Sequence, residues 1–292
     1  MKDRASKLLE SGLIDAFGMS VIDFTQGSFE DFELLSKEEE EYSKAEVFYD
    51  IASLTKVLTN AFAHQLKGSF SQESDLALNH RGGIVSWGLL PRKGWKEQIL
   101  RYQIKPSATD YSDFSALRYQ LDFEEHFGES MYDVVNPYFS DVLHWLDLTD
   151  QHTLINGQEK LAANRFRVHD PNARNISERL CHAGLFASLK GLSQTLLNFH
   201  QQTDWLLKVK NGLTLKHRFE FGLDRVMDPQ NTLAGLGASE KTVGHLGFTG
   251  CSFWVDLERM TGVVILSNIT KNYWFRRQEF NELRKSLNWD QL

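Results

Sequence analysis

Cysteine is scarce in this chain, because only Cys181 and Cys251 occur among its 292 residues, far apart and without a C-x-x-C partner. A disulfide framework and a thiolate metal site are therefore not indicated, and we expect two buried free thiols. The ten histidines show no H-E-x-x-H or similar helical spacing. We accordingly expect neither a metal nor a cofactor.

Long apolar runs and an excess of positive charge are also missing. The sequence nowhere holds the roughly 18 to 20 apolar residues that a membrane-spanning helix requires, so we expect no membrane span. Lys plus Arg number 32 against 39 for Asp plus Glu, and the net charge of −7 argues against a nucleic-acid partner. The first residues alternate charged and apolar types, so we expect a cytoplasmic protein, or a periplasmic one if a leader precedes this sequence.

Patterns along the chain predict an α+β protein. Residues 2–13 read as an amphipathic helix and residues 16–24 as a strand, and longer helical patterns cover 51–67 and run from Tyr111 to about Gly128. Glutamates 38–41 read as solvated surface. The last third predicts an antiparallel meander and a closing helix over 273–287; its short β-type runs are 218–225, 241–246, 251–257 and 262–268.

The segment Ser53-Leu54-Thr55-Lys56 is the only S-x-x-K in the chain, and it opens a predicted helix. Residues three apart share a helix face, so the Lys56 amine can reach the Ser53 hydroxyl. We expect the helix dipole and partial burial to lower the pKa of Lys56, which would make it a proton acceptor for an otherwise poor nucleophile. The structural alternative is a serine that caps the helix and a solvated lysine.

A second element, Tyr111-Ser112-Asp113, is the only Y-S-D and lies at a predicted loop-to-helix transition. The Tyr111 hydroxyl could pass a proton between nucleophile, lysine and leaving group, and Asp113 could hold the lysine or contact substrate. Alternatively, Asp113 is a helix cap and Tyr111 a packing residue.

A third element, Gly244 to Gly250, runs out of one predicted strand and turns into the next. Glycines allow a substrate to approach the backbone closely, and the Phe248 N–H could join the Ser53 N–H in stabilising an oxyanion. A plain glycine-rich turn is the alternative. Since all three elements occur in order and in the context that each requires, we favour the joint functional interpretation.

Through these three motifs and the stretches around them, the chain resembles the β-lactamase-related serine hydrolases, which include class C β-lactamases, D-alanyl-D-alanine carboxypeptidases and penicillin-binding-protein-like esterases. The likeness runs from about Phe48 to Asn268. Its blocks, in the family's order, are FYDIASLTKVLT, LALNHRGGIVSWGLLP, TDYSDFSAL, RVHDPNAR, CHAGLFASLKGLSQ, RFEFGLD and GHLGFTGCSFWVDLERMTGVVILSN.

The resemblance implies a β-lactamase/transpeptidase-like fold, in which terminal helices flank an antiparallel sheet and the nucleophile lies between the sheet and a helical subdomain. We expect one domain over 1–292, with an α/β part near 1–67 and 210–292 and a helical part near 68–209. The resemblance further implies that Ser53 is the nucleophile, Lys56 its base partner and Tyr111 the proton relay. The strand from His245 to Gly247 would form the substrate-side wall.

Three positions depart from the family's pattern. His245 replaces the lysine of the K-T-G motif, Leu246 stands where a hydroxyl residue commonly binds a substrate carboxylate, and Asp113 stands where class C β-lactamases use asparagine. A leucine cannot donate a hydrogen bond and an aspartate repels an anion, so we expect a substrate with an uncharged end rather than efficient β-lactam hydrolysis.

The leading hypothesis is a serine acyl hydrolase for a small-molecule or peptidoglycan-derived substrate, either an ester or a D-amino-acid peptide or β-lactam-like amide. A second hypothesis, motivated by Leu246, is a catalytically lapsed protein that uses the same cleft to bind peptidoglycan fragments or a partner. The sequence identifies neither the substrate nor the oligomeric state.

Overall fold

The computed structural model describes residues 1–36, 47–149, 153–155 and 168–292. The predicted surface run of glutamates 38–41 lies outside these ranges. Among the described residues, no helix has the length and apolar character needed to cross a membrane.

The central feature is a seven-stranded sheet whose strand order is β2-β1-β11-β10-β9-β8-β7, with every neighbouring pair antiparallel. The first and last long strands lie side by side, with Phe17 opposite Ser267. The strands are β1 Ala16–Asp23, β2 Ser28–Leu35, β7 Phe219–Glu220, β8 Leu223–Arg225, β9 Thr242–Leu246, β10 Ser252–Asp256 and β11 Thr261–Ser267.

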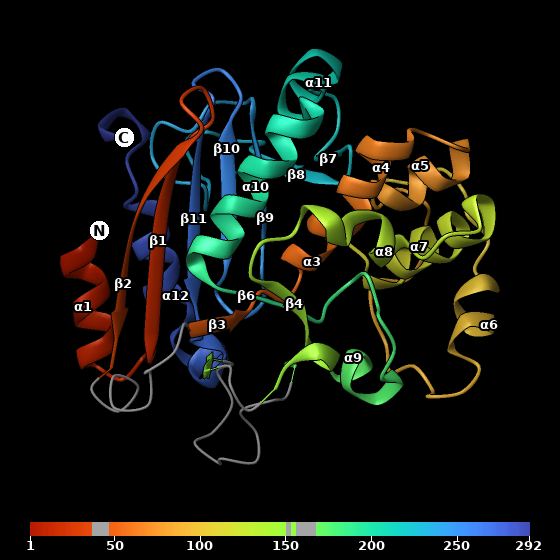
Figure 1. Cartoon of the computed structure of the whole chain (residues 1–292), viewed down its shortest axis with the longest axis horizontal. Coiled ribbons are helices and arrows are strands. Elements are labelled where there is room, and N and C mark those ends of the chain that lie inside the picture. The colour runs from red at the N-terminus through yellow and green to blue at the C-terminus, as the bar shows by residue number, and fades with distance from the viewer. Residues whose placement is uncertain (37–46, 150–152, 156–167) are drawn as a thin grey trace.

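Helices cover both faces of this sheet (Figure 1). Side chains of β11 alternate between two hydrophobic cores, because Val263 and Ile265 face one core and Val264 and Leu266 the other. The terminal helices α1 (Lys2–Glu10) and α12 (Tyr273–Lys285) cover the first core, and α10 (Leu189–Thr203) covers the second. The predicted flanking of an antiparallel sheet by terminal helices is therefore confirmed.

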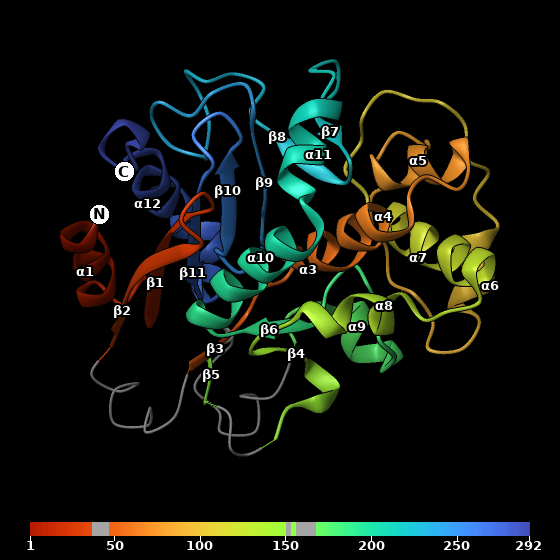
Figure 2. The same ribbon diagram turned by 45° about the horizontal axis from the view of Figure 1, so that its top comes forward.

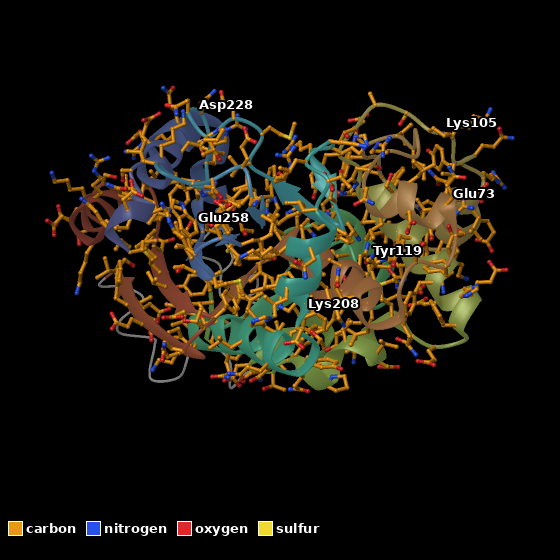
Figure 3. The ribbon with its side chains drawn as sticks, turned by 90° about the horizontal axis from the view of Figure 1, so that it is seen from above. Glu73, Lys105, Tyr119, Lys208, Asp228 and Glu258 are labelled. Atoms are coloured by element: carbon orange, nitrogen blue, oxygen red, sulfur yellow. The ribbon has the colours of Figure 1, made fainter. Side chains whose placement is uncertain are left out.

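The helical part lies beside the sheet, and Figure 2 shows α3 (Leu54–Lys56) where the two meet. Seen from above, Glu73 and Lys105 lie on the helical part, and Asp228 and Glu258 lie on the sheet part, on the other side of the molecule (Figure 3). The remaining helices of the helical part are α4 Phe62–Lys67, α5 Gln72–Leu78, α6 Trp95–Leu100, α7 Asp113–Phe127, α8 Met131–Val135, α9 Pro171–Ile176 and α11 Trp205–Gly212.

A small second sheet, ordered β4-β6-β3-β5, lies below the junction. Its strands are β3 Val47–Asp50, β4 Val142–His144, β5 Thr153–Ile155 and β6 Leu185–Ala187. The short connecting 3-10 helices are Asn136–Tyr138, Trp145–Asp147, Ile269–Asn272 and Trp289–Gln291.

Most predicted elements match the structure, with local differences. The long helix predicted over 51–67 begins at Leu54 and contains a π-helical segment, Val57–Ala61. The stretch 68–96 holds the short helix α5, which a reciprocal Ser71–Ser74 cap stabilises. The division of the chain at about residue 210 stays a prediction, although α10, inside the predicted helical part, packs on the sheet.

Candidate active site

The nucleophile candidate Ser53 sits on a sharp turn between β3 and α3. Ala52 adopts a left-handed backbone conformation with φ of 47°, which a non-glycine residue rarely adopts without support. The buried Asp50 carboxylate supplies that support, because it accepts hydrogen bonds from the Ala52 N–H at 2.9 Å and the His169 N–H at 2.6 Å. Burial raises the pKa of Asp50 to about 6, against the opposing effect of these two hydrogen bonds. The turn leaves Ser53 half-buried at the wall of a pocket.

Lys56 lies directly beneath Ser53 and is almost fully buried. Its Nζ is 3.1 Å from the Ser53 Oγ, 2.9 Å from the His182 carbonyl oxygen and 2.7 Å from the Asp113 carboxylate. Burial alone lowers the pKa of Lys56, but the Asp113 carboxylate, with a smaller contribution from Tyr111, holds this pKa above its ordinary value. The prediction of a lowered pKa for Lys56 is therefore wrong, because an anion lies against the amine.

The Asp113 carboxylate belongs to a group of possible metal ligands that also includes Asp170 and His182. The ammonium of Lys56 already lies 2.7 Å from Asp113, and the His182 Nε2 lies 3.0 Å from the Asp170 carboxylate. Burial raises the pKa of Asp170, but the His182 ring beside it brings the pKa below its ordinary value. Asp113 is thus ion-paired with Lys56, and the Asp170 carboxylate lies against the His182 ring, so both carboxylates already have a basic side chain beside them.

Tyr111 packs against the lysine from the other side, with the Lys56 Nζ 5.1 Å from the centre of its ring. Burial, together with the Asp113 charge, raises the pKa of Tyr111 despite the opposing influence of Lys56 and Ser53. The buried hydroxyl lies near Lys56 and Ser53, but it makes no hydrogen bond of good geometry to a described residue. Tyr111 is therefore a neutral phenol with an unsatisfied hydroxyl.

The helix that follows Tyr111 begins with Ser112 as its cap, not Asp113. The Ser112 Oγ accepts a hydrogen bond from the Ser115 N–H at 2.9 Å and donates one to the Val85 carbonyl oxygen at 2.6 Å. Asp113 pairs with Lys56 instead, which is one of the two functional roles that the sequence predicted for it. It does not line the pocket beside Ser53, so its predicted contact with substrate stays a prediction.

The third predicted element, Gly244 to Gly250, contributes another wall of the pocket that Ser53 lines. His245 and Leu246 end β9, and the turn from Gly247 to Gly250 is closed by hydrogen bonds from the Gly247 N–H to the Cys251 carbonyl oxygen at 2.7 Å and from the Gly250 N–H to the Gly247 carbonyl oxygen at 3.1 Å. A Cβ atom added to Gly247 would lie 2.8 Å from the Ile51 carbonyl oxygen. Only glycine therefore permits this close approach.

Two observations bear on the backbone N–H groups of Ser53 and Phe248, the predicted oxyanion donors. The Thr249 hydroxyl donates a hydrogen bond to the Asp50 carbonyl oxygen at 2.6 Å, which ties this turn to the segment before Ser53. The Ser53 N–H finds no acceptor among the residues that the structure describes, and Phe248 lines the same pocket. The geometry is compatible with a donor pair at Ser53 and Phe248, which stays a prediction.

His245 is buried and faces the pocket. Its Nδ1 lies 2.8 Å from the Leu246 carbonyl oxygen, whereas its Nε2 has no hydrogen-bond partner among the described residues. Burial and the charge of Lys56 lower the pKa of His245 to about 3, so that the imidazole is neutral at ordinary pH.

A pocket of about 320 Å³ unites these groups. Ser53 and Tyr111 line it together with the four consecutive residues from His245 to Phe248. The remaining wall combines apolar side chains with three arginines and one carboxylate; these residues are Leu233, Ile269, Phe280, Arg218, Arg277, Arg284 and Asp224.

Comparisons with known proteins give structural relatives only. No family model matches the chain, and no curated protein does. A class C β-lactamase from Rhodobacter sphaeroides superposes with a TM-score of 0.67 and 15% identity, covering 97% of each chain. The chain has a β-lactamase-like fold.

Two further structures with the β-lactamase-like fold are similar. A β-lactamase/D-alanine carboxypeptidase from Pseudomonas syringae has a TM-score of 0.62 and 12% identity, over 97% of this chain and 96% of that one. SurE, solved with D-Leu, has a TM-score of 0.64 and 16% identity, over 97% of this chain and 72% of its own. The α+β, β-lactamase/transpeptidase-like fold predicted from the motifs is confirmed.

The arginines that line this pocket were not singled out from the sequence. Arg218 is half-exposed and is held by the Asp224 carboxylate through two hydrogen bonds of 2.9 and 2.8 Å. Both residues lie in the stretch RFEFGLD, which carried part of the resemblance without a role of its own. Three arginines and one carboxylate therefore line the pocket, and Arg218 and Asp224 pair with each other.

Proposed function

We propose that the chain is a serine acyl hydrolase that forms an acyl-enzyme at Ser53. One observation carries the proposal: the Ser53 hydroxyl lies 3.1 Å from a buried lysine, at the wall of a pocket between the sheet and the helical part. A serine needs a polarising neighbour to act as a nucleophile, and the strained turn holds its side chain at the pocket. The β-lactamase-like fold supports the proposal by analogy.

In the proposed reaction, Ser53 attacks a carbonyl carbon and Lys56 acts as a cation. An ammonium that donates to the Ser53 Oγ stabilises negative charge as it develops on that oxygen. Tyr111 relays the serine proton, because its oxygen takes that proton while its own hydroxyl proton passes to a further acceptor, and the reverse transfer supplies a proton to the leaving group. The N–H groups of Ser53 and Phe248 stabilise the oxyanion, at the end of β9 where the wall from His245 to Gly247 positions the substrate.

The pocket lining supports a substrate whose leaving group is apolar and carries a negative charge. Leu246 and Phe248 offer apolar surface near Ser53, and Arg218 offers a guanidinium in the same pocket. D-Leu, with which SurE was solved, combines an apolar side chain with a carboxylate. We therefore propose an ester or a D-amino-acid peptide with such an end as substrate, in preference to an uncharged one.

The raised pKa of Lys56, which follows from the Asp113 carboxylate beside it, favours a second candidate. If no other group accepts the serine proton, the protein is a catalytically lapsed relative that binds peptidoglycan fragments or a partner in this pocket. Such a protein would bind ligands without forming a covalent adduct.

Intact-mass measurement after treatment with a fluorophosphonate separates the two candidates. The hydrolase should gain the mass of one phosphonyl group, and Ser53→Ala should abolish the gain. Ser69→Ala, which removes an exposed hydroxyl outside the pocket, is the matched control and should label like the unmodified chain. Labelling that persists in Ser53→Ala, or an unmodified chain that never labels, would end the proposal. Turnover of p-nitrophenyl esters, nitrocefin and D-Ala-D-Ala peptides then ranks the substrates.

A further inference from the structure

Lys56 is held as a cation by its neighbours, which leaves the fate of the serine proton open. Its Nζ donates hydrogen bonds to the Ser53 Oγ and the His182 carbonyl oxygen and forms an ion pair with the Asp113 carboxylate at 2.7 Å. The group that receives the Ser53 proton must have a lone pair. Lys56 in this arrangement has none.

Two orphaned polar atoms lie on neighbouring rings in the same pocket. The Tyr111 hydroxyl and the His245 Nε2 are both buried, and neither has a hydrogen-bond partner among the described residues. A buried polar atom without a partner calls for an explanation, and a catalytic role is one of them. The two rings are 5.6 Å apart between centres, at an angle of 50°, and both line the pocket beside Ser53.

The hydrogen position on His245 follows from its neighbour. The Nδ1 lies 2.8 Å from the Leu246 carbonyl oxygen, and a carbonyl oxygen can only accept. The Nδ1 of the neutral ring therefore carries the hydrogen, and the Nε2 carries the lone pair. A backbone carbonyl thus orients this imidazole as a carboxylate orients the histidine of a catalytic triad.

We propose that the His245 Nε2 is the final acceptor of the Ser53 proton, which reaches it through the Tyr111 hydroxyl. The inference rests on the proposed acyl-enzyme function and names the base of that reaction. His245 thereby takes over the role of base that we expected for Lys56. It stands at the position where the family's K-T-G motif has its lysine.

The proton transfers balance without a further reactant. As the Ser53 Oγ bonds to the substrate carbonyl carbon, its proton passes to the Tyr111 oxygen and the Tyr111 proton passes to the His245 Nε2. The carbonyl electron pair moves to the oxygen, which becomes the oxyanion. When the bond to the leaving group breaks, the imidazolium returns the proton through Tyr111 to the departing atom.

The surrounding charges keep His245 in its neutral form at neutral pH. Burial, Lys56 and Arg218 disfavour the imidazolium, whereas Asp113 favours it. The second imidazole against Tyr111, His80, is also neutral, because burial and Lys56 hold its pKa well below its ordinary value. The oxyanion that forms with the acyl bond supplies the negative charge that the imidazolium needs. The titratable and charged groups that face His245 are Lys56, Tyr111, His80, Asp113 and Arg218.

The pH dependence of fluorophosphonate labelling of the full chain tests the proposal. If neutral His245 accepts the proton, the labelling rate constant, corrected for reagent hydrolysis, should change by less than about threefold between pH 6 and pH 9. If neutral Lys56 is the base, the rate should rise about tenfold per pH unit over the same range, or about a thousandfold in all. The second result would overturn the proposal.

A variant pair provides an independent measurement. His245→Gln keeps a side chain of similar polarity without a basic nitrogen, and it should label Ser53 about a hundredfold more slowly, with a rate that now rises with pH. His80→Gln is the matched control, because His80 packs on the same Tyr111 ring at 4.7 Å while its Nδ1 already accepts the Ser112 N–H.

The control should keep the flat pH profile. A His245→Gln chain that labels at the unmodified rate with a flat profile would refute the role of His245 while leaving the acyl-enzyme intact. An unmodified chain that fails to label at every pH would instead refute the proposed function itself, and the relay with it.

Discussion

Replacing Asp113 by asparagine should destabilise the folded chain most near neutral pH and least in alkaline solution. At 2.7 Å, the attraction between Lys56 and Asp113 is about 6 kcal/mol for an effective dielectric constant near 20. Removing one partner of a buried ion pair costs roughly 3 to 5 kcal/mol. Since asparagine still accepts a hydrogen bond from Lys56, we expect a loss near the lower end, about 3 kcal/mol at pH 7.

The pH dependence follows from the direction of each pKa. In the unmodified chain the pKa of Lys56 is raised, so its stabilising contribution is complete below its ordinary pKa and is lost only in strongly alkaline solution. In Asp113→Asn, burial should lower the pKa of Lys56, so the unfolded chain binds the extra proton and stability rises with pH. The difference between the two chains should therefore shrink by about 2 kcal/mol from pH 7 to pH 9.

Urea denaturation at pH 7, 8 and 9, followed by tryptophan fluorescence, measures this difference. Asp122→Asn is the matched control on the same helix, because Asp122 pairs with Arg118 at 2.8 Å and its side chain is as exposed as that of Asp113. Arginine does not lose its proton in this range, so the cost of the control should not vary with pH. Parallel pH curves for the two variants would refute the reasoning.

Three further changes probe the turn, the pocket and the pocket wall that contains Gly247. The pKa of Asp50, raised by burial from 3.8 to about 6, means that the native chain binds the extra proton; its stability should fall by about 2 kcal/mol as pH rises from 4 to 6, and urea denaturation of Asp50→Asn should lack this loss. Arg218→Ala should raise KM about tenfold for an anionic ester and leave KM for its neutral analogue unchanged in paired assays. Gly247→Ala should lower the melting temperature, since the new Cβ would meet the Ile51 carbonyl oxygen and cost about 1 to 3 kcal/mol.

The sequence predicted the parts of the site that depend on short-range geometry. Ser53 and Lys56 lie one helical turn apart, so their 3.1 Å contact follows from helix geometry alone. The strands of the last third also followed from alternating patterns. The edge strand β2 was not predicted, because its half-exposed, acidic sequence buries too little apolar surface to show a strand pattern.

The properties that were missed depend on contacts between distant segments. The pairing of Lys56 with Asp113 requires α7 to begin against α3, and no local pattern contains that arrangement. The same contact reversed the expected direction of the Lys56 pKa. The sequence shows Arg218 as one residue of the stretch RFEFGLD. Only the folded structure shows that Arg218 lines the pocket and can contact a substrate there.

The pairing of β1 with β11 governs the order in which this chain can fold. β1 and β2 leave the ribosome first and can pair with each other, yet the other edge of β1 waits until β11 has been synthesised. Helix α1 likewise waits for α12 before their shared core can close. Because such distant pairing is slow, a nascent chain carries an open strand edge for most of its synthesis, and a chain cut before Thr261 would keep that edge exposed and prone to aggregate.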